Sequence, residues 1–444
     1  MSRCSINRAL LTPTPTSLLV LLTSHNCYSF LPLRFRCRSH PFNVTNCRTT
    51  LASARKKFVP LALGPRHPHH RDRHQRRLLR STPLSLKRTY LSTSRMAALM
   101  PRGYRSVTEY RFREEQTDAI VRATAYHRKD YCRSVIWFSP REHVSIRSSI
   151  TTPFRRASNM GLGFLDRLPL ELLHDILLRL DIYSLFNFRQ TNLRSRQTVD
   201  SLKQYQMVVL YGLNLLCALL RTRLAIGVSL SDFYYILCTK ACTFCSEFGG
   251  FISLLTWNRC CFICLQEALE TQVQTLATVR KQFHLRKTEL NQLKSFKTLP
   301  GIYSMKESVY KSRITVVSVH QAILFSGQQP HTLAQVQPSS GRNQKFNFMG
   351  SCALPYYDSR TGRVEYGMSC AGCQLALEKD IIGSRGERWA FEARDKVYAQ
   401  DGFLEHFRWC EQAQLLWRSS GEGNNQPTEL PEAARRGGYF NNRE

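Results

Sequence analysis

Residues 166–192 read DRLPLELLHDILLRLDIYSLFNFRQTN and hold the clearest helical pattern in the chain. Apolar side chains recur at positions 168, 172, 173, 176, 177 and 180, in steps of three and four, which predicts one amphipathic helix. Pro169 suits its first turn, where a missing backbone N–H costs nothing. Asp181 can cap a second helix, and Thr191 or Asn192 can open a third that runs toward Val209. We therefore predict three short helices with apolar surface left for a partner.

The same stretch resembles an F-box. The family pattern is Leu-Pro-x-Glu, then Ile-Leu, a further Leu and a Ser-Leu…Phe-Arg segment, and all of it is present here. The resemblance implies docking onto the Skp-type adaptor of SCF (cullin-RING) ubiquitin ligases. It also implies that seven residues line or support that interface: Leu168, Pro169, Leu172, Ile176, Leu180, Leu185 and Phe188.

Cysteine pairs follow the helical segment. Cys242-x₂-Cys245 is separated by 15 residues from Cys261-x₂-Cys264, which is the spacing of a four-cysteine zinc site in a reducing compartment. Cys260 is an alternative to Cys261, although only Cys261 restores the Cys-x₂-Cys spacing. We expect Gly249-Gly250 to turn the intervening loop. A redox dithiol is the other interpretation, but two pairs exceed what one exchange centre needs.

A second group of ligand types lies further along the chain. Cys370-x₂-Cys373 and His406-x₃-Cys410 would together form a Cys₃His zinc site with 32 residues between the halves. Cys352 is the alternative fourth ligand if His406 faces solvent. In the competing interpretation, His406 and Cys410 are ordinary helix residues. The sequence thus predicts one or two structural zinc ions.

Three further stretches are similar to a group of filamentous-fungal F-box proteins. They are Arg259 through Leu265, Leu293 through Met305 and Ser351 through Asp358. The similarity extends over about residues 161–417. It implies no particular substrate.

The basic charge is distributed unevenly. The 444 residues include 63 Lys+Arg and 32 Asp+Glu, a net charge of +31, of which residues 1–160 carry +23. Residues 1–159 show no lasting apolar period, so we predict disorder there. Their composition fits a mitochondrial transit peptide, or an extension that is absent if synthesis starts at Met160. No run approaches eighteen apolar residues, so no transmembrane helix is expected.

The predicted fold is mainly α: a three-helix F-box at 160–208, followed by an irregular α+β zinc-stapled region. Residues 209–325 are expected to form a cysteine-rich helical region, with a helix over 266–297 and a strand over 313–319. We predict a linker at 326–347, a second cysteine-containing region at 348–417 and a disordered tail at 418–444.

Enzyme signatures are absent from the sequence, which has no Walker or dinucleotide glycine loop and no Gly-x-Ser-x-Gly elbow. The predicted function is a non-catalytic adaptor that joins a Skp-type adaptor and cullin scaffold to an unknown protein substrate. It would act in the cytoplasm or nucleus, or in the mitochondrion if residues 1–95 are a transit peptide. The competing class is a zinc-dependent nucleic-acid-binding regulator, against which the modest charge of residues 161–444, +8, argues.

Overall fold

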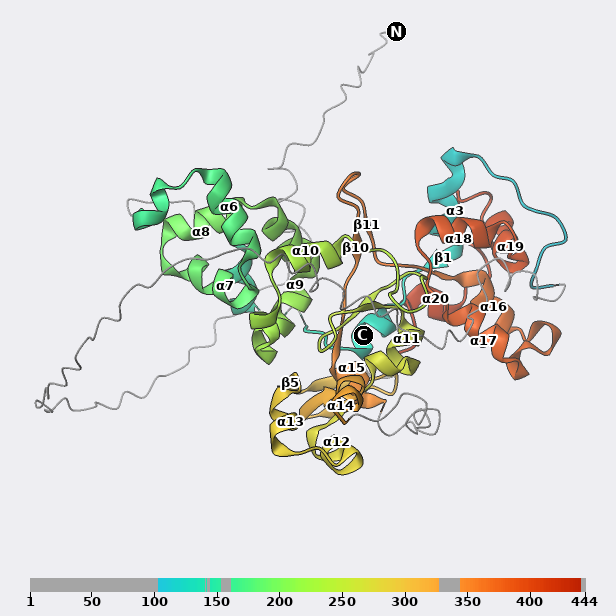
Figure 1. Ribbon diagram of the computed structural model, residues 1–444. Coiled ribbons are helices and arrows are strands. Elements are labelled where there is room, and N and C mark those ends of the chain that lie inside the picture. The colour runs from blue at the N-terminus through green and yellow to red at the C-terminus, as the bar shows by residue number, and fades with distance from the viewer. Residues whose placement is uncertain (1–102, 140, 142–143, 153–160, 327–343, 441–444) are drawn as a thin grey trace, which may run out of the picture. The chain divides into compact units, whose positions relative to one another are not determined.

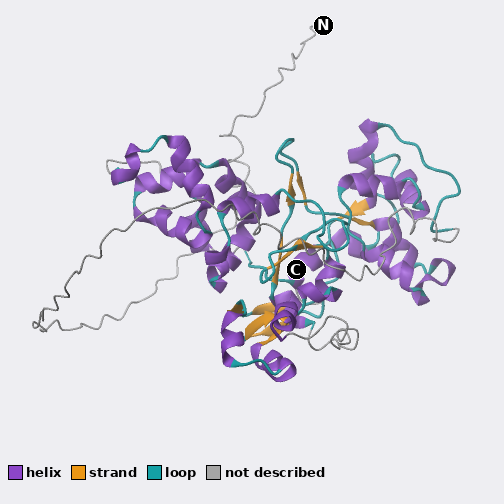
Figure 2. Cartoon of the chain, in the orientation of Figure 1, coloured by secondary structure: helices purple, strands orange, loops and turns teal. Residues whose placement is uncertain are grey.

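The computed structural model describes residues 103–139, 141, 144–152, 161–326 and 344–440 (Figure 1). Helices dominate these residues, and the strands are short (Figure 2). The predicted mainly α fold class, with three short helices followed by a mixed α+β region, is confirmed. The predictions for residues 1–102 and most of the 326–347 linker fall on residues outside the described ranges.

Three short helices occupy the segment with the strongest pattern: α6 (Leu170–Arg179), α7 (Ile182–Thr191) and α8 (Leu193–Ser201). Asp181 caps α7 by accepting hydrogen bonds from the N–H groups of Tyr183 and Ser184, at 3.0 and 2.9 Å. Asn192 caps α8 by accepting from the Ser195 N–H at 2.7 Å. The predicted third helix does not run on to Val209, because Leu202 is extended and separates α8 from the next helix.

Helix α9 (Lys203–Thr222) continues from this bundle into the cysteine-rich region. By length and composition it could cross a membrane, but about half of it is buried within the protein, as in the core helix of a globular domain. Gly212 permits close packing on α10 (Leu230–Leu237), since a Cβ there would lie 2.9 Å from the Phe233 ring. The boundary predicted after residue 208 therefore falls inside a helix, and one apolar core includes residues on both sides of it.

Two three-stranded sheets follow. The first has the order β3-β2-β9, from Arg259–Cys260, Phe251–Ser253 and Ser351–Ala353. The second has the order β4-β8-β5, from Val273–Thr275, Thr315–Ser318 and Ser295–Lys297. Val316 in β8 belongs to the large core, whereas its neighbour Val317 belongs to a smaller core with Val279 and Leu293. Since successive strand residues face opposite sides, this sheet separates the two cores.

The helix predicted over 266–297 is wrong. The chain forms α11 (Phe262–Glu267), β4, α12 (Leu276–Phe283), α13 (Lys287–Gln292) and β5 instead. Val273 pairs with Ser318 and Gln274 with Val317, so tertiary pairing overrides the helical stripe. The strand predicted over 313–319 is confirmed as β8, which α14 (Val319–Ser326) follows.

The C-terminal region is helical and contains a core of its own. It contains β12 (Ser369–Cys370), α16 (Ala371–Glu378), α17 (Arg388–Asp395), α18 (Gln400–Phe407), α19 (Glu411–Ser419) and α20 (Glu432–Arg436). Residues from 418 onward were expected to be disordered, but Ala433 and Ala434 of α20 are buried. The described part of the tail is therefore ordered.

The described residues between 103 and 152 are also ordered, contrary to prediction. They form α3 (Thr117–Thr124), β1 (Ala125–Tyr126), α4 (Lys129–Ser134) and α5 (Val144–Thr151). Ile120 and Ile150 are fully buried, and Ala125 of β1 pairs with Cys370 of β12. The apolar residues of this stretch are sparse and show no helical or strand spacing. Segments distant in the sequence bury them individually. A chain that began at Met160 would lack these core residues.

Candidate metal centres and adaptor interface

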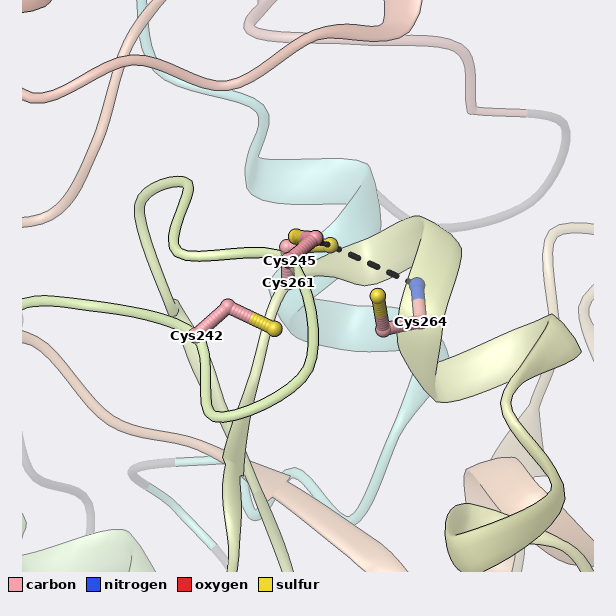
Figure 3. A group of neighbouring side chains, drawn as sticks. All are labelled: Cys242, Cys245, Cys261 and Cys264. Atoms are coloured by element: carbon pink, nitrogen blue, oxygen red, sulfur yellow. Dashed lines mark hydrogen bonds between the residues drawn. The ribbon is translucent and has the colours of Figure 1, made fainter. Parts of the chain in front are cut away.

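The first cysteine quartet brings together a loop and a helix start. Cys242 and Cys245 lie in the loop between α10 and β2, while Cys261 is the N-cap of α11 and Cys264 is in its first turn. The four sulfur atoms all lie within 4.8 Å of one another. Figure 3 shows the four side chains converging from these two segments. The structure therefore places the four predicted ligands together.

Backbone N–H groups hold these sulfur atoms in place. Phe244 donates to Cys242 Sγ and Cys264 donates to Cys261 Sγ, each at 3.4 Å. Ser246 closes the first turn with a φ of +64° and donates its N–H to the Cys242 carbonyl oxygen at 3.0 Å. Hydrogen bonds from the other three thiols hold the pKa of Cys242 far below its usual range. The low pKa favours the thiolate of Cys242, the form that binds metal, whereas the hydrogen bonds among the thiols raise the pKa of Cys261 and Cys264.

The distances in this quartet match a tetrahedral metal site. Cys245 Sγ and Cys261 Sγ are 3.6 Å apart. Zinc–sulfur bonds of about 2.3 Å in a tetrahedron put two sulfur atoms about 3.8 Å apart. A disulfide would require about 2.05 Å. The donor set and its spacing therefore fit a four-coordinate zinc ion.

Cys260 lies outside the quartet, so the structure selects Cys261. Cys260 is in β3, where its burial raises the pKa of its thiol well above the usual range. The turn of this loop lies at residues 243–245 rather than at the predicted Gly249-Gly250, and neither glycine has a positive φ. Gly249 has another role. It permits close approach instead, because a Cβ there would lie 2.9 Å from Arg259 Cγ and 3.2 Å from Cys242 N.

The side chain of Arg259 holds this loop in place through hydrogen bonds to backbone carbonyl oxygens. Its buried guanidinium donates to the carbonyl oxygens of Gly249, Ile236 and Leu354, at 2.5, 2.8 and 2.9 Å. Burial lowers the pKa of Arg259 to about 10. The side chain therefore ties the cysteine loop to the end of α10 and to the strand region after β9.

The second quartet joins three helices. Cys370 is the N-cap of α16, Cys373 lies in its first turn, His406 lies in α18 and Cys410 is the N-cap of α19. Their ligand atoms lie within 4.8 Å of one another, and all four residues are buried. Cys410 Sγ is 3.7 Å from Cys370 Sγ and 3.9 Å from Cys373 Sγ. Hydrogen bonds from Cys370 and Cys373 hold the pKa of Cys410 well below its usual range.

His406 points into this quartet. Its Nε2 is 3.3 Å from Cys373 Sγ, and its ring stacks on Tyr398 with centroids 4.9 Å apart. Cys352, the alternative ligand, lies in β9 and accepts a hydrogen bond from Asn214 Nδ2 at 3.0 Å. It does not join the quartet. The second donor set is thus Cys₃His, which also suits zinc.

Sequence reasoning missed the residues that support this second site. Arg105 forms a β-bridge with Cys410, and Ser106 N–H donates to the Trp409 carbonyl oxygen at 2.9 Å. A Cβ on Gly372 would overlap the backbone nitrogen of Ala413, so α16 and α19 can approach only because residue 372 is glycine. The glycine of the Cys-Ala-Gly-Cys motif could have indicated this close helix packing. No nearby sequence feature indicated the role of Arg105.

The predicted adaptor-binding residues divide into two groups. Leu172 and Ile176 on α6 are 53% and 43% exposed, while their neighbours Leu173 and Leu177 are buried in the core. Helix α6 therefore has apolar residues on both its inner and its outer faces. Of the other predicted residues, Pro169 is exposed, Leu168, Leu180 and Phe188 are half-buried, and Leu185 is buried. The buried and half-buried members support the exposed ones.

An ion pair between a buried arginine and an aspartate joins two helices of this bundle. Arg189 of α7 donates to both carboxylate oxygens of Asp200 in α8, at 2.7 and 3.1 Å. It also donates to the Ser149 carbonyl oxygen of α5 at 2.6 Å. A fork-to-carboxylate pair of this kind fixes both distance and orientation. These contacts link α7 to α8 and to α5.

Comparison with known proteins finds a family similarity in this helical bundle. No curated protein and no solved structure matches the chain. A family model described as F-box domain matches residues 165–207. The matched residues include α6, α7 and α8, together with the exposed Leu172 and Ile176. The protein therefore contains an F-box domain at residues 165–207.

Proposed function

We propose that this protein is the substrate-recruiting subunit of an SCF-type cullin-RING ubiquitin ligase. Its F-box would bind the Skp-type adaptor, and its cysteine-rich region would bind a protein substrate. The observation that carries the proposal is the apolar row on the outer face of α6. Leu172 and Ile176 lie one turn apart on the same side of the helix and are 53% and 43% exposed, in a segment that matches the F-box family.

Burial of this row against a partner would stabilise a complex. Full burial of one Leu or Ile side chain contributes about 1.5–3 kcal/mol, so two that are about half-exposed contribute roughly 2 kcal/mol when covered. Two aromatic side chains in the same part of the chain, Tyr183 of α7 and Phe164, are also exposed, at 46% and 81%. Aromatic and branched apolar side chains are typical anchors of protein interfaces. The row therefore supports docking of a partner helix.

The chain acts by proximity under this proposal. It holds a substrate near the ligase, which raises the effective concentration of the substrate, and other subunits supply the bond chemistry. This role requires no catalytic residue in the chain. The expected location is the cytoplasm or nucleus, because paired Cys-x₂-Cys thiols bind metal in a reducing compartment.

We also propose that each quartet binds one structural zinc ion. Zinc would cross-link α11 to the preceding loop in the first site, and α16 to α18 and α19 in the second. Elemental analysis of the purified protein is expected to find two zinc ions per chain. Cys261→Ser should lose one of them and Cys260→Ser should lose none, because only Cys261 belongs to a quartet. Absence of zinc in the unmodified protein would contradict both sites.

The adaptor proposal is tested by co-purification after co-expression with a Skp-type adaptor. The variant Leu172→Asp/Ile176→Asp places two charges on the exposed row and should abolish association, and Leu168→Asp/Pro169→Ala should weaken it. The matched control is Val309→Asp/Leu324→Asp, because both side chains are 64% exposed outside the F-box. The control should co-purify as the unmodified chain does. Equal recovery of all four proteins would show that the F-box does not make the contact.

A further inference from the structure

Positive charge is concentrated in one part of the chain after residue 160. Residues 273–326 contain nine Lys+Arg and two Asp+Glu, a net of +7, while residues 161–444 as a whole carry +8. They form β4, α12, α13, β5, β6 (Gly301–Tyr303), β7 (Ser308–Tyr310), β8 and α14, and the smaller core lies among them. This body therefore carries a local excess of positive charge.

Within this body the cations concentrate between two helices. Residues 280–287, here called the basic connector, join the end of α12 to the start of α13. Phe283 and Leu285 are each 5% exposed and anchor the connector in the smaller core. The residues around these anchors are exposed and basic: Arg280, Lys281, His284, Arg286 and Lys287. His284 has a φ of +51°, and this single left-handed residue reverses the chain between the two helices.

The helix dipoles favour only two of the four Lys and Arg side chains of the basic connector. Arg280 and Lys281 lie in the last turn of α12, where a positive charge is favourable. Arg286 and Lys287 lie at the start of α13, where the same dipole disfavours it. None of the four forms an ion pair with any residue that the structure describes. Folding stability thus gives no reason for this clustering of positive charge, whereas binding of an anionic partner does.

We infer that the basic connector binds an acidic segment of the protein substrate. The inference rests on the proposed function, and it names the chemical class of the substrate. A run of Asp and Glu side chains complements the exposed cations, and such complementarity also accelerates encounter. Single-stranded nucleic acid is the poorer fit, because it needs exposed rings for base stacking and the connector's phenylalanine, Phe283, is buried.

The test measures binding of fluorescent probes to the full chain in complex with the Skp-type adaptor. The probes are an aspartate- and glutamate-rich peptide, the same peptide with Asn and Gln in place of the acids, and an oligothymidylate. The test variant reverses four charges: Arg280→Glu, Lys281→Glu, Arg286→Glu and Lys287→Glu. The control makes the same change in net charge at four exposed arginines elsewhere: Arg111→Glu, Arg113→Glu, Arg122→Glu and Arg360→Glu.

The acidic peptide should bind the unmodified chain more tightly than either other probe. The test variant should lose about tenfold or more of that affinity, since each exposed charge pair contributes modestly and four are removed. The control should lose less than twofold. Equal loss in both variants, or tighter binding of oligothymidylate, would overturn the inference. Adaptor association of the test variant is measured separately, so failure of the F-box and failure of the connector are distinguished.

Discussion

His406 Nε2 lies 3.3 Å from Cys373 Sγ, although the two residues are 33 positions apart in the sequence. Cys373 is in the first turn of α16 and His406 is near the end of α18, so the contact depends on how these helices pack. Tyr398 stacks on the imidazole and limits its rotation. A ring held in this way is oriented before a metal binds, which is what a structural site requires.

This relationship predicts distinct effects for two substitutions of His406. His406→Cys supplies another zinc-binding side chain and should keep two zinc ions per chain, whereas His406→Ala should keep one. The measurement is zinc content by elemental analysis together with the thermal unfolding midpoint. Cys352→Ser is the control and should also keep two, since Cys352 is outside the quartet. Loss of zinc in the Cys352 variant, with retention in His406→Ala, would reverse the assignment.

Gly372 sets the separation of α16 and α19. A Cβ there would overlap the backbone of Ala413, so Gly372→Ala should separate the two helices and lower the free energy of unfolding by about 2 kcal/mol or more. The same variant should bind zinc more weakly at the second site. Gly386→Ala is the matched control, because no atom lies within 4 Å of its Cβ position. Equal stability of the two variants by chemical denaturation would contradict this packing.

The segment before residue 160 is predicted to be required for the second site. β1 pairs with β12, which contains Cys370, and Ile120 is buried in the same core as Cys373 and Phe407. A chain that begins at Met160 should therefore unfold at a lower temperature and retain less than two zinc ions. A chain that begins at Met100 keeps these elements and should match the full chain. Identical behaviour of both truncations would show that the segment is dispensable.

His127 predicts a dependence of stability on pH. Burial lowers its pKa below the usual 6.5, against an opposing hydrogen bond to the Gly367 carbonyl oxygen. A group whose pKa is depressed in the folded state contributes stability above the unfolded pKa and loses it as the pH falls through the folded value. Acidification below about 6.5 should therefore reduce the free energy of unfolding less in His127→Gln than in the unmodified protein.

Local chemistry made part of the molecule predictable. Each Cys-x₂-Cys motif places two thiols on one turn regardless of the surrounding fold, so the spacing alone identified the cysteine pairs of both quartets. The caps at Asp181 and Asn192 were equally accessible, because the capping side chain bonds to N–H groups two or three residues away. In these cases the determinants of structure lie within a few residues.

Long-range pairing made the rest unpredictable. Tyr104 and Ile120 carry no period of their own, and they are buried only because segments more than two hundred residues away cover them. Val273 fits a helical stripe by spacing, but its partner in β8 makes it a strand residue. Likewise, hydrophobic spacing alone did not show which apolar residues of α6 face outward, although the F-box resemblance named Leu172 and Ile176. Leu172 and Leu173 are adjacent and chemically identical, yet one is exposed and the other is buried.

Titration of the purified chain with a purified Skp-type adaptor tests the central claim most directly. We expect one saturable site, with affinity lost in Leu172→Asp/Ile176→Asp and kept in Val309→Asp/Leu324→Asp. Circular dichroism of all three proteins should be the same, since the substituted side chains are exposed. An unmodified chain that is folded and zinc-loaded, yet binds no adaptor, would contradict the account.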